Sequence, residues 1–537
     1  MPKKIKDPIY GYIEIEDEYL HIIDSVYFQR LRHIIQTSYT SIYPSALHNR
    51  FTHSLGVYWL GNIAFDALSR NSPEICSKIS KAKLNEIRKT FILACLCHDL
   101  GHSPFSHTGE KFYNVKEING QLVQEVANKA YKKDLDEAKK VVGKQHEIMS
   151  ALLAIKKFGD VIGQNNFALF ARCIIGLQYG DNSVTSSKEK QCVPLYKACI
   201  ELLNSNIIDV DKLDYLIRDS YMSGYSSVAI DYQRLLNGVF ANDGKYPVGY
   251  EKSALSVLES VLTAHDMERR WIQAHPVIQY EGYLLQTIIR ELSSQYNGQD
   301  RELLSLAALT EEGQALNEIG TIRLLSDADI LYLAKKNYQV SDAVKEYCDR
   351  RLRRHPIWKS EAEFSLLFDF KRNETFVEIL LKWEEKLLDG LYGVYSLNET
   401  FYDALQKEAE DLSHRKSTLP DGSQKDTLSK RIEKLNTELS LLKQIWDYLD
   451  GKSIPFDIVI VSQKQFKSNI YKAAFKELPI RFDRISNDIK KMEEASFIPW
   501  DTQEDQVFFY LYYKRKKNVD PINVDEFSKM LRRAAII

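Results

Sequence analysis

The sequence lacks a membrane-spanning apolar run, a large net charge and a disulfide framework. It has no run of about 18 apolar residues, the length that a membrane-spanning helix needs, so no membrane partner is expected. Its 72 basic and 74 acidic residues nearly cancel, to a net charge of −2. No global basic field therefore favours nucleic acid, although a local basic site stays open. The seven cysteines are odd in number and irregularly spaced, unlike a disulfide framework.

What is present is ordinary globular composition. The chain has 537 residues, of which 44% are apolar and 27% charged. This length can bury a large core without disulfide or zinc cross-links. Cys95 and Cys97 lie inside an apolar run, and the first 20 residues lack the apolar stretch of a secretory signal. We therefore expect free, mostly buried thiols in a cytoplasmic protein.

Apolar periodicity predicts a mainly α fold: an all-helical core with a smaller α+β C-terminal region. Residues 5–16 alternate in polarity and predict an extended lead-in. The expected domains are a core at 1–355 with an insertion at 111–145, a charged helical region at 356–450 and a small α+β region at 451–537. Helical patterns cover 20–36, 54–69, 84–100, 122–142, 146–157, 165–176, 194–206, 211–221, 231–237, 252–295, 301–309, 313–318, 327–336 and 340–353.

The region 356–450 contains a heptad seam. Leu428, Ile432, Leu435, Leu439, Leu442, Trp446 and Leu449 follow one another at steps of four and three residues. The seam fits a helix in an antiparallel hairpin or a dimerising coiled coil, and the sequence leaves both open. Beyond it, residues 456–461, 479–482 and 507–513 read as strands.

Four residues from distant parts of the chain form a candidate metal site: His53, the pair His98–Asp99, and Asp211. Two imidazoles and two carboxylates suit Zn, Fe, Mn or Co better than a thiolate-seeking metal. Residues 91–97 are apolar all round, which predicts a buried helix that ends at His98. A buried carboxylate beside a buried imidazole costs free energy unless it is paired or bound to metal.

Basic residues near these candidates predict an anion site. Arg50 precedes His53 by three residues, and Lys212 follows Asp211 directly. Arg270 is a less certain third member. A guanidinium is a fixed fork for phosphate and an ammonium is a point charge. Taken alone, each residue fits a surface ion pair better than a phosphate contact. Beside the candidate metal site the balance reverses for Arg50 and Lys212, and it is even for Arg270.

Three further histidines are candidates for proton transfer. His102 and His107 can serve as proton donors or phosphate contacts. In His146–Glu147 the carboxylate could orient the imidazole, as in a general acid/base pair. The alternative is that this pair caps the start of a helix.

These motifs together resemble the HD-domain deoxynucleoside triphosphate (dNTP) triphosphohydrolases. The resemblance is closest to the branch with the vertebrate SAM-and-HD-domain enzyme and its bacterial relatives. It covers about residues 1–285 and continues more weakly through 322–356. The matching stretches are 7–14, 23–24, 28–32, 48–56, 98–107, 146–147 and 209–219.

The resemblance implies an activity and a cofactor. In this family an activated water attacks the α-phosphorus and releases a nucleoside and inorganic triphosphate. The cofactor would be a divalent ion (Mn, Fe, Zn, Co or Ni at the metal site, with Mg on the nucleotide). It also implies roles for residues: His53, His98, Asp99 and Asp211 hold the metal; Arg50, Lys212 and Arg270 bind phosphates; His102, His107 and His146 line the triphosphate, with Glu147 behind His146; Gln36, Tyr215 and Asp219 meet the sugar.

Family members often carry a second, regulatory nucleotide site between subunits. Asp24, Gln29, Arg30 and Arg32 match the stretch that contributes to it, which implies regulation by dGTP or GTP and a homo-oligomer from dimer to hexamer. An ordinary amphipathic helix is the alternative reading. Thr37 stands where the well-known branch has an apolar leucine against the sugar, so discrimination between deoxyribose and ribose is open.

Two other functions compete with the dNTP triphosphohydrolase. One is an HD-type phosphohydrolase that acts on another nucleotide. The other is a non-catalytic regulator that binds nucleotide or nucleic acid. The complete set of candidate ligands argues against the regulator, because a site without selection for catalysis would lose ligands.

Overall fold

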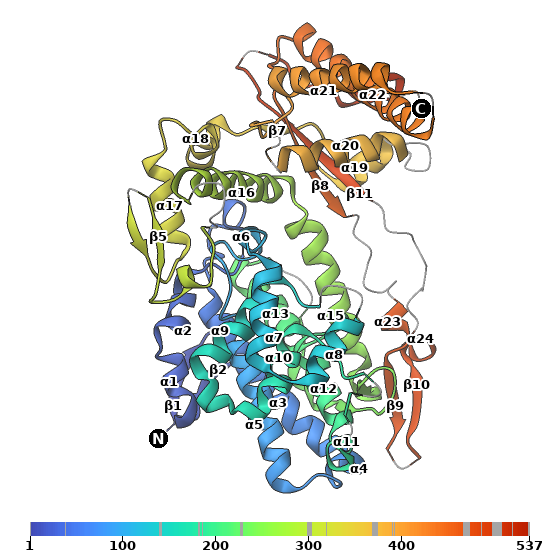
Figure 1. Ribbon diagram of the computed structural model, residues 1–537. Helices are drawn as coiled ribbons and strands as arrows, with labels where there is room; N and C mark the ends of the chain where they lie inside the picture. The colour runs from blue at the N-terminus through green and yellow to red at the C-terminus, as the bar shows by residue number, and fades with distance from the viewer. Residues whose placement is uncertain are drawn as a thin grey trace. The chain divides into compact units, whose positions relative to one another are not determined.

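The computed structural model of the chain folds into two compact units (Figure 1). Unit 1 comprises residues 1–273, 288–338 and 467–503, and unit 2 comprises 274–287, 339–466 and 504–537. The structure describes residues 2–534 apart from 38, 139–141, 181, 182, 185, 226–228, 298–302, 318, 368–373, 389, 391, 421, 465–472, 485, 497–506 and 518.

Unit 1 begins with the predicted extended segment, which forms a hairpin of β1 (Lys3–Asp7) and β2 (Gly11–Ile15). Asp7 stabilises the turn, since its Oδ1 accepts the main-chain N–H groups of Ile9 at 2.8 Å and Tyr10 at 3.0 Å. Gly11 closes the turn with a φ of +81°, which glycine adopts without strain.

The body of unit 1 is helical, and this confirms the mainly α prediction. Residues 91–97 are fully buried within α5, as their all-apolar pattern predicts. The helices are α1 (Leu20–Ile23), α2 (Val26–Arg30), α3 (Arg50–Asn71), α4 (Pro73–Cys76), α5 (Lys81–Cys97), α6 (His107–Glu110), α7 (Val115–Val126), α8 (Lys129–Glu137), α9 (Gln145–Ile162), α10 (Phe167–Ile175), α11 (Ser187–Lys190), α12 (Val193–Leu203), α13 (Val210–Ser223), α14 (Tyr232–Asn237), α15 (Leu255–Glu268), α17 (Asp327–Lys336), α23 (Ala473–Lys476) and α24 (Met492–Ala495), while α16 (Pro276–Asn297) has residues in both units.

Two helical predictions in this unit are wrong, 313–318 and the described part of 301–309. Residues 313–318 contain β5 (Gln314–Leu316), which pairs antiparallel with β6 (Gly320–Ile322). Gly313 and Gly320 have φ values of +81° and +100°, so they turn the chain where a helix would have to continue. Residues 303–309 contain only a single 3₁₀ turn.

A four-stranded sheet in unit 1 joins distant segments. Its order is β10 (Asp488–Lys491), β9 (Pro479–Asp483), β4 (Val248–Glu251) and β3 (Val239–Ala241). The run at 479–482 was predicted as a strand, but β3 and β4 were not. Both are too short for a period-two pattern to stand out.

Unit 2 contains a sheet of order β7 (His355–Pro356), β11 (Val507–Tyr513) and β8 (Ile458–Lys464), and the last two match predicted strands.

The heptad seam lies on α22, and its residues Leu435, Leu442 and Leu449 are buried in one core with Leu405 and Leu412 of α21. Figure 1 shows the two helices side by side. The helices are α18 (Asp342–Cys348), α19 (Glu361–Leu367), α20 (Glu374–Leu388), α21 (Glu399–Thr418), α22 (Ser423–Gly451) and α25 (Val524–Ala534).

Two exclusions from composition can be compared with the structure. All seven cysteines are free thiols, and five of them are buried, as expected. In the described part of the chain, every helix is too short or too polar to cross a bilayer. The three-domain division at 355 and 450 stays a prediction.

Candidate active site

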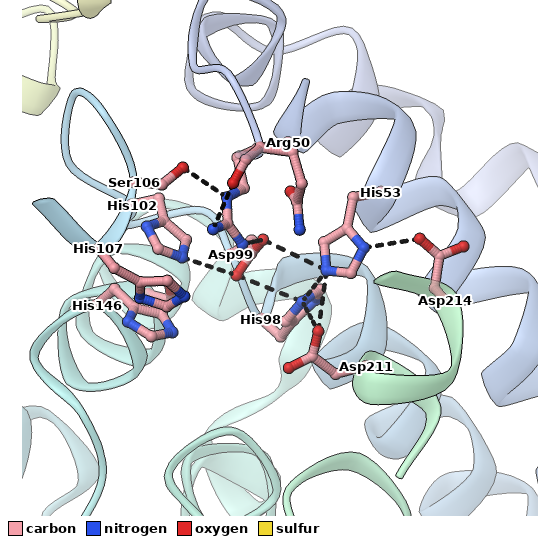
Figure 2. A network of polar contacts seen from close by, with 12 residues as sticks. Arg50, His53, His98, Asp99, His102, Ser106, His107, His146, Asp211 and Asp214 are labelled. Carbon is pink, nitrogen blue, oxygen red and sulfur yellow. Dashed lines mark hydrogen bonds and ion pairs between the residues drawn. The ribbon is translucent and has the colours of Figure 1, made fainter. Parts of the chain in front are cut away.

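Three helices of unit 1 bring the four predicted metal ligands together (Figure 2). His53 lies in the first turn of α3, His98 and Asp99 directly follow α5, and Asp211 lies in the first turn of α13. His53 Nε2 is 2.9 Å from Asp211 Oδ1, 3.3 Å from His98 Nε2 and 3.6 Å from Asp99 Oδ2. His98 Nε2 is 3.4 Å from Asp99 Oδ1. We call these four residues the metal group.

Hydrogen bonds on the far side of each imidazole fix which nitrogen faces the group. His53 Nδ1 bonds Asp214 Oδ2 at 2.7 Å, and His98 Nδ1 bonds the Cys95 carbonyl at 2.9 Å. A carboxylate and a carbonyl only accept, so both Nδ1 atoms carry the hydrogen. In the neutral rings both Nε2 atoms then present lone pairs. His53, His98 and Asp99 place their donor atoms within 4.8 Å of one another, and Asp211 Oδ1 lies 2.9 Å from His53 Nε2, an arrangement that favours a cation.

The spacing of the donor atoms fits a metal ion. Ligands about 2.1 Å from an ion lie roughly 3.0–3.4 Å from one another in octahedral or tetrahedral arrangements. The measured separations of 2.9–3.6 Å bracket that range. A nitrogen and oxygen donor set suits Mn, Fe, Zn or Co. The residues present therefore fit the ion that the sequence predicted.

Protons take the place of a cation when no ion is bound. Burial disfavours a charged His53, but its hydrogen bonds to Asp211 and Asp214 outweigh burial and raise its pKa to about 10. The pKa of His98 is raised too, against the effect of burial, by Asp99 and Asp211. The same contacts lower the pKa of Asp211 well below its usual range. Metal must displace these protons in order to bind.

A second layer of residues holds His53 in place. Arg218 bonds both carboxylate oxygens of Asp214, at 2.9 and 3.0 Å. Burial raises the pKa of Asp214, but Arg218 and His53 outweigh burial and lower it to about 2. Gly56, one turn after His53, makes room for this pair, since a Cβ there would lie 1.8 Å from Asp214 Oδ1. The packing of α3 against α13 therefore requires glycine at this position.

Positive charge lies beside the metal group. Arg50 is buried, and its Nη1 donates to Asp99 Oδ2 at 2.7 Å while its Nε donates to Ser106 Oγ at 3.0 Å (Figure 2). Lys212 donates from Nζ to Asp209 and to the carbonyl of Ser205. Burial lowers the pKa of Lys212, but Asp209 outweighs burial and raises it, so Lys212 is charged.

The three further histidines form a second cluster, the histidine group, joined by a carboxylate. The rings of His102 and His146 stack with centroids 4.0 Å apart, and His107 lies edge-on, 5.2 Å from His102. Glu110 accepts from Nδ1 of His107 at 3.0 Å and from Nδ1 of His146. His102 Nε2 lies 3.4 Å from Asp99 Oδ1, which connects this group to the metal group.

Electrostatics differ between the two groups. Burial, reinforced by Arg50 and His146, lowers the pKa of His102 well below its usual range. Desolvation by the surrounding protein atoms also lowers the pKa of His107, against the effect of Glu110, although its side chain is 57% exposed. The two hydrogen bonds from the imidazoles outweigh burial and depress the pKa of Glu110. His102 and His107 are therefore held neutral beside an ionised Glu110 at pH 7.

A family model described as "HD domain" matches residues 50–214. The matched stretch is similar to HD domains. It contains the metal group and the histidine group, together with Arg50 and Lys212. The resemblance to HD-domain dNTP triphosphohydrolases that the motifs predicted is confirmed by curated relatives.

Those relatives share part of their length with this chain. A deoxynucleoside triphosphate triphosphohydrolase SAMHD1 homolog of Dictyostelium discoideum is 34% identical over 236 residues, covering 44% of this chain and 39% of the relative. The zebrafish (Danio rerio) deoxynucleoside triphosphate triphosphohydrolase SAMHD1 is 30% identical over 352 residues, covering 59% and 50%. An uncharacterized protein of Methanocaldococcus jannaschii is 29% identical, covering 54% and 50%. The chain thus spans about half the length of the relatives it matches, or less.

Solved structures share the fold over nearly the whole chain. A phosphohydrolase from Bacteroides thetaiotaomicron aligns with a TM-score of 0.54 and 19% identity, covering 96% of this chain and 100% of its own. A hypothetical protein from Aquifex aeolicus aligns with a TM-score of 0.52 and 18% identity, covering 100% and 99%. At these identities the likeness concerns the fold alone.

The predicted sugar contacts lie at the other end of α13. Asp211, Tyr215 and Asp219 are spaced by four residues and so share one face of this helix. Asp219 Oδ1 bonds His48 Nε2 at 2.7 Å, and the His48 carbonyl accepts the main-chain N–H of Gln36 at 2.9 Å. These contacts bring Gln36 and Asp219 into one neighbourhood. Arg270 lies exposed in a π-helical turn (Arg269–Gln273), and its phosphate role stays a prediction.

Sequence reasoning missed Glu110 and assigned its part to Glu147. The structure places Glu147 at the start of α9, where its carboxylate accepts the main-chain N–H of Lys144 at 2.8 Å. Its other oxygen is 4.0 Å from His146 Nε2, whereas Glu110 bonds Nδ1 directly. The capping alternative describes this geometry better. The signal for Glu110 was its three-residue spacing from His107, one helical turn.

The four predicted regulatory residues do not all face one way. Asp24 pairs with Lys3 at 2.8 Å, and Arg32 donates from Nε to Gln29 Oε1 at 2.8 Å. Arg30, by contrast, is buried and donates to main-chain carbonyls in the interior. A nucleotide site built on Asp24, Gln29 and Arg32 stays a prediction, and the geometry gives Arg30 another partner.

Proposed function

We propose that this protein is a metal-dependent hydrolase that converts dNTPs to deoxynucleosides and inorganic triphosphate. The observation that carries the proposal is the convergence of four metal-binding side chains next to Arg50 and the histidine group. The names of the SAMHD1 relatives support the substrate class.

When bound, a divalent ion would supply a nucleophile at neutral pH and neutralise charge on a phosphoryl oxygen. His53, His98, Asp99 and Asp211 would hold it. Because His53 and His98 are fixed through Nδ1, their Nε2 atoms need no rearrangement to bind.

The remaining residues act on the triphosphate. Arg50 can offer its guanidinium to a phosphate while its contact with Asp99 keeps it in place. Lys212 adds a point charge at the start of α13, where the helix dipole also favours an anion. Both groups stabilise the negative charge on the triphosphate oxygens as water attacks the α-phosphorus and the bond to the nucleoside 5′-oxygen breaks.

The histidine group supplies the proton for the leaving group. With Nδ1 of His107 and His146 on Glu110, their Nε2 atoms face away from that carboxylate. An approaching triphosphate raises the pKa of these imidazoles, and a protonated Nε2 can then donate to the leaving oxygen. Glu110 stabilises the imidazolium and fixes its orientation.

Product analysis tests the proposal. The metal-loaded protein is incubated with each dNTP and each NTP, and phosphorus NMR or ion chromatography identifies the phosphate products. We expect inorganic triphosphate in a one-to-one ratio with nucleoside. Pyrophosphate or orthophosphate as the sole product would reject triphosphate release and favour an HD phosphohydrolase of another class. Binding of nucleotide without turnover would favour the non-catalytic regulator.

Sugar specificity is part of the same screen. Thr37 is buried, and its hydroxyl has no hydrogen-bond partner within the described structure. A hydroxyl at this position can accommodate a ribose hydroxyl more readily than an apolar side chain. The chain should therefore accept NTPs alongside dNTPs, and Thr37→Leu should raise the preference for dNTPs. Equal dNTP/NTP ratios in both proteins would contradict this assignment. Regulation by dGTP or GTP, a homo-oligomer and cytoplasmic location belong to the same proposal.

A further inference from the structure

One element outside the HD domain contacts the main chain around the histidines. Asp327 is the first residue of α17, more than a hundred residues beyond the end of the HD match. It is 5% exposed. Its Oδ1 accepts the main-chain N–H of Phe105 at 2.7 Å, and its Oδ2 accepts that of Ile35 at 2.9 Å. Each carboxylate oxygen thus holds a different loop.

The first of these loops carries catalytic candidates. Residues 100–106, here called the histidine turn, contain His102 and lead directly into His107 at the start of α6. Phe105 and Ser106 have φ values of 57° and 54°, in the left-handed region that non-glycine residues rarely occupy. Such strain persists only where the surroundings hold the backbone in place.

The second loop, residues 34–36, is tied to the same turn. Ser106 Oγ donates to the Ile35 carbonyl at 2.6 Å and accepts from Arg50 Nε at 3.0 Å. Arg50 Nη2 donates to the Gln36 carbonyl at 3.3 Å. Asp327 and Ser106 therefore bridge the same two loops from two directions, and Arg50 joins them to Asp99.

Arg30 adds a third attachment. Its Nη2 donates to the carbonyls of Leu100 at 3.1 Å and His102 at 2.6 Å, and its Nη1 donates to the Leu325 carbonyl at 2.8 Å. Leu325 lies two residues before Asp327, so the segment that begins α17 is joined to the start of the histidine turn through Arg30 and to its end through Asp327. Unlike the second layer around His53, these contacts reach the main chain rather than the imidazole rings.

We propose that Asp327 is a positioning residue: through its two main-chain hydrogen bonds, it holds the strained histidine turn so that His102 faces Asp99 and His107 faces Glu110. It touches neither metal ligands nor substrate. Its effect on turnover rests on the proposed hydrolase function, whereas its effect on the geometry of the turn does not.

Asp327→Asn is the decisive variant. Asparagine keeps the shape, but its NH₂ group faces one of the two main-chain N–H donors, so one bond is lost and two donors oppose each other. The matched control is Asp329→Asn, which removes the same charge from the same helical turn. Asp329 Oδ2 accepts from Ser326 N at 2.8 Å and Oγ at 2.7 Å, and these contacts cap α17.

We expect Asp327→Asn to lower kcat roughly 10- to 100-fold, since a displacement of about 1 Å at a catalytic group has an effect of this size. The metal content per chain should be unchanged. The two variants should lower the thermal stability by similar amounts. Asp329→Asn should nevertheless leave kcat close to that of the wild type. Equal kcat for wild type and Asp327→Asn, or equal losses in the two variants, would overturn the proposal.

Histidine NMR separates this proposal from the proposed function. In protein labelled with ¹³C-histidine, the ring C–H resonances of His107 should move in Asp327→Asn and stay in place in Asp329→Asn, with or without catalysis. Absence of any hydrolysis in the wild type would reject the proposed function alone. Unmoved His107 resonances in a folded Asp327→Asn would reject the positioning role alone. Should this variant not fold, Asp327→Glu, which moves the carboxylate by one methylene, must show the same resonance shifts.

Discussion

The metal group and the histidine group use the same side-chain types for opposite purposes. In the metal group, carboxylates surround the imidazoles and raise the pKa of His53 to about 10. In the histidine group, burial and positive neighbours lower the pKa values of His102 and His107. One arrangement attracts a cation, and the other offers imidazoles that take up a proton only when an anion arrives.

The two groups differ in the ratio of carboxylates to imidazoles and in which ring nitrogen the carboxylates face. The metal group has Asp99 and Asp211 on the Nε2 side of its two imidazoles. The histidine group has a single carboxylate, Glu110, which lies on the Nδ1 side of His107 and His146. Variants of the two groups should therefore fail in different ways.

The largest effect is expected for Asp211→Asn. The amide cannot supply a negative ligand and leaves the lone pairs of His53 and His98 without their charge partner. We expect loss of bound metal and of all measurable turnover, with the helical circular dichroism spectrum unchanged. Elemental analysis and the product assay check both. The control is Asp66→Asn, since Asp66 is an exposed residue of α3 that pairs with Arg88. Full turnover in Asp211→Asn would remove this residue from the metal group.

Glu110→Gln should separate the two groups. It leaves the metal group intact but removes the carboxylate that orients His107 and His146. Turnover should fall by roughly 10²- to 10⁴-fold, the usual contribution of general acid catalysis, at unchanged metal content. Glu147→Gln should show a clearly smaller fall, because Glu147 caps α9. A larger fall in Glu147→Gln than in Glu110→Gln would restore the assignment made from sequence.

Asp214→Asn sharpens the comparison from the metal side. It weakens the hydrogen bond to His53 Nδ1 and the pairing with Arg218. We expect metal affinity to fall about 10- to 100-fold, as is typical when such an outer carboxylate is lost. Excess metal should restore turnover in this variant and leave Glu110→Gln inactive. Failure of excess metal to rescue Asp214→Asn would mean that the residue acts on folding alone.

The smallest effect is a pH dependence of stability. His53 has a pKa of about 10 in the folded, metal-free protein and about 6.5 when unfolded. A raised folded pKa stabilises fully below pH 6.5, and this contribution is lost as pH rises through 10. The Tm of the metal-free protein should therefore decline over this window. Bound metal replaces the proton, so the Tm gain from metal should grow with pH. A gain that shrinks with pH would contradict the protonation scheme.

Much of this site could be predicted from the sequence because its residues sit in local patterns. The apolar run 91–97 predicted a buried helix before His98, and the pair His98–Asp99 at its end predicted a bound metal or another partner. Glu110 was missed because its contact with His146 depends on how α6 meets α9, which no local pattern encodes. Asp327 was missed for the same reason, since its partners are main-chain groups far away in the sequence.

The fold shows the same limit. Long helices such as α9 and α17 follow from periodicity, whereas the hairpin of β5 and β6 was read as helical because two glycines, rather than the apolar pattern, decide its course. The heptad seam of α22 fitted two partners, and only the structure gives it α21.

X-ray absorption spectroscopy of the metal-loaded protein tests the central claim most directly. The claim is that His53, His98, Asp99 and Asp211 bind one divalent ion through two imidazole nitrogens and carboxylate oxygens. We predict a first shell of nitrogen and oxygen donors near 2.1 Å with outer-shell scattering from two imidazoles. A sulfur shell, scattering from fewer than two imidazoles, or no bound metal would contradict it.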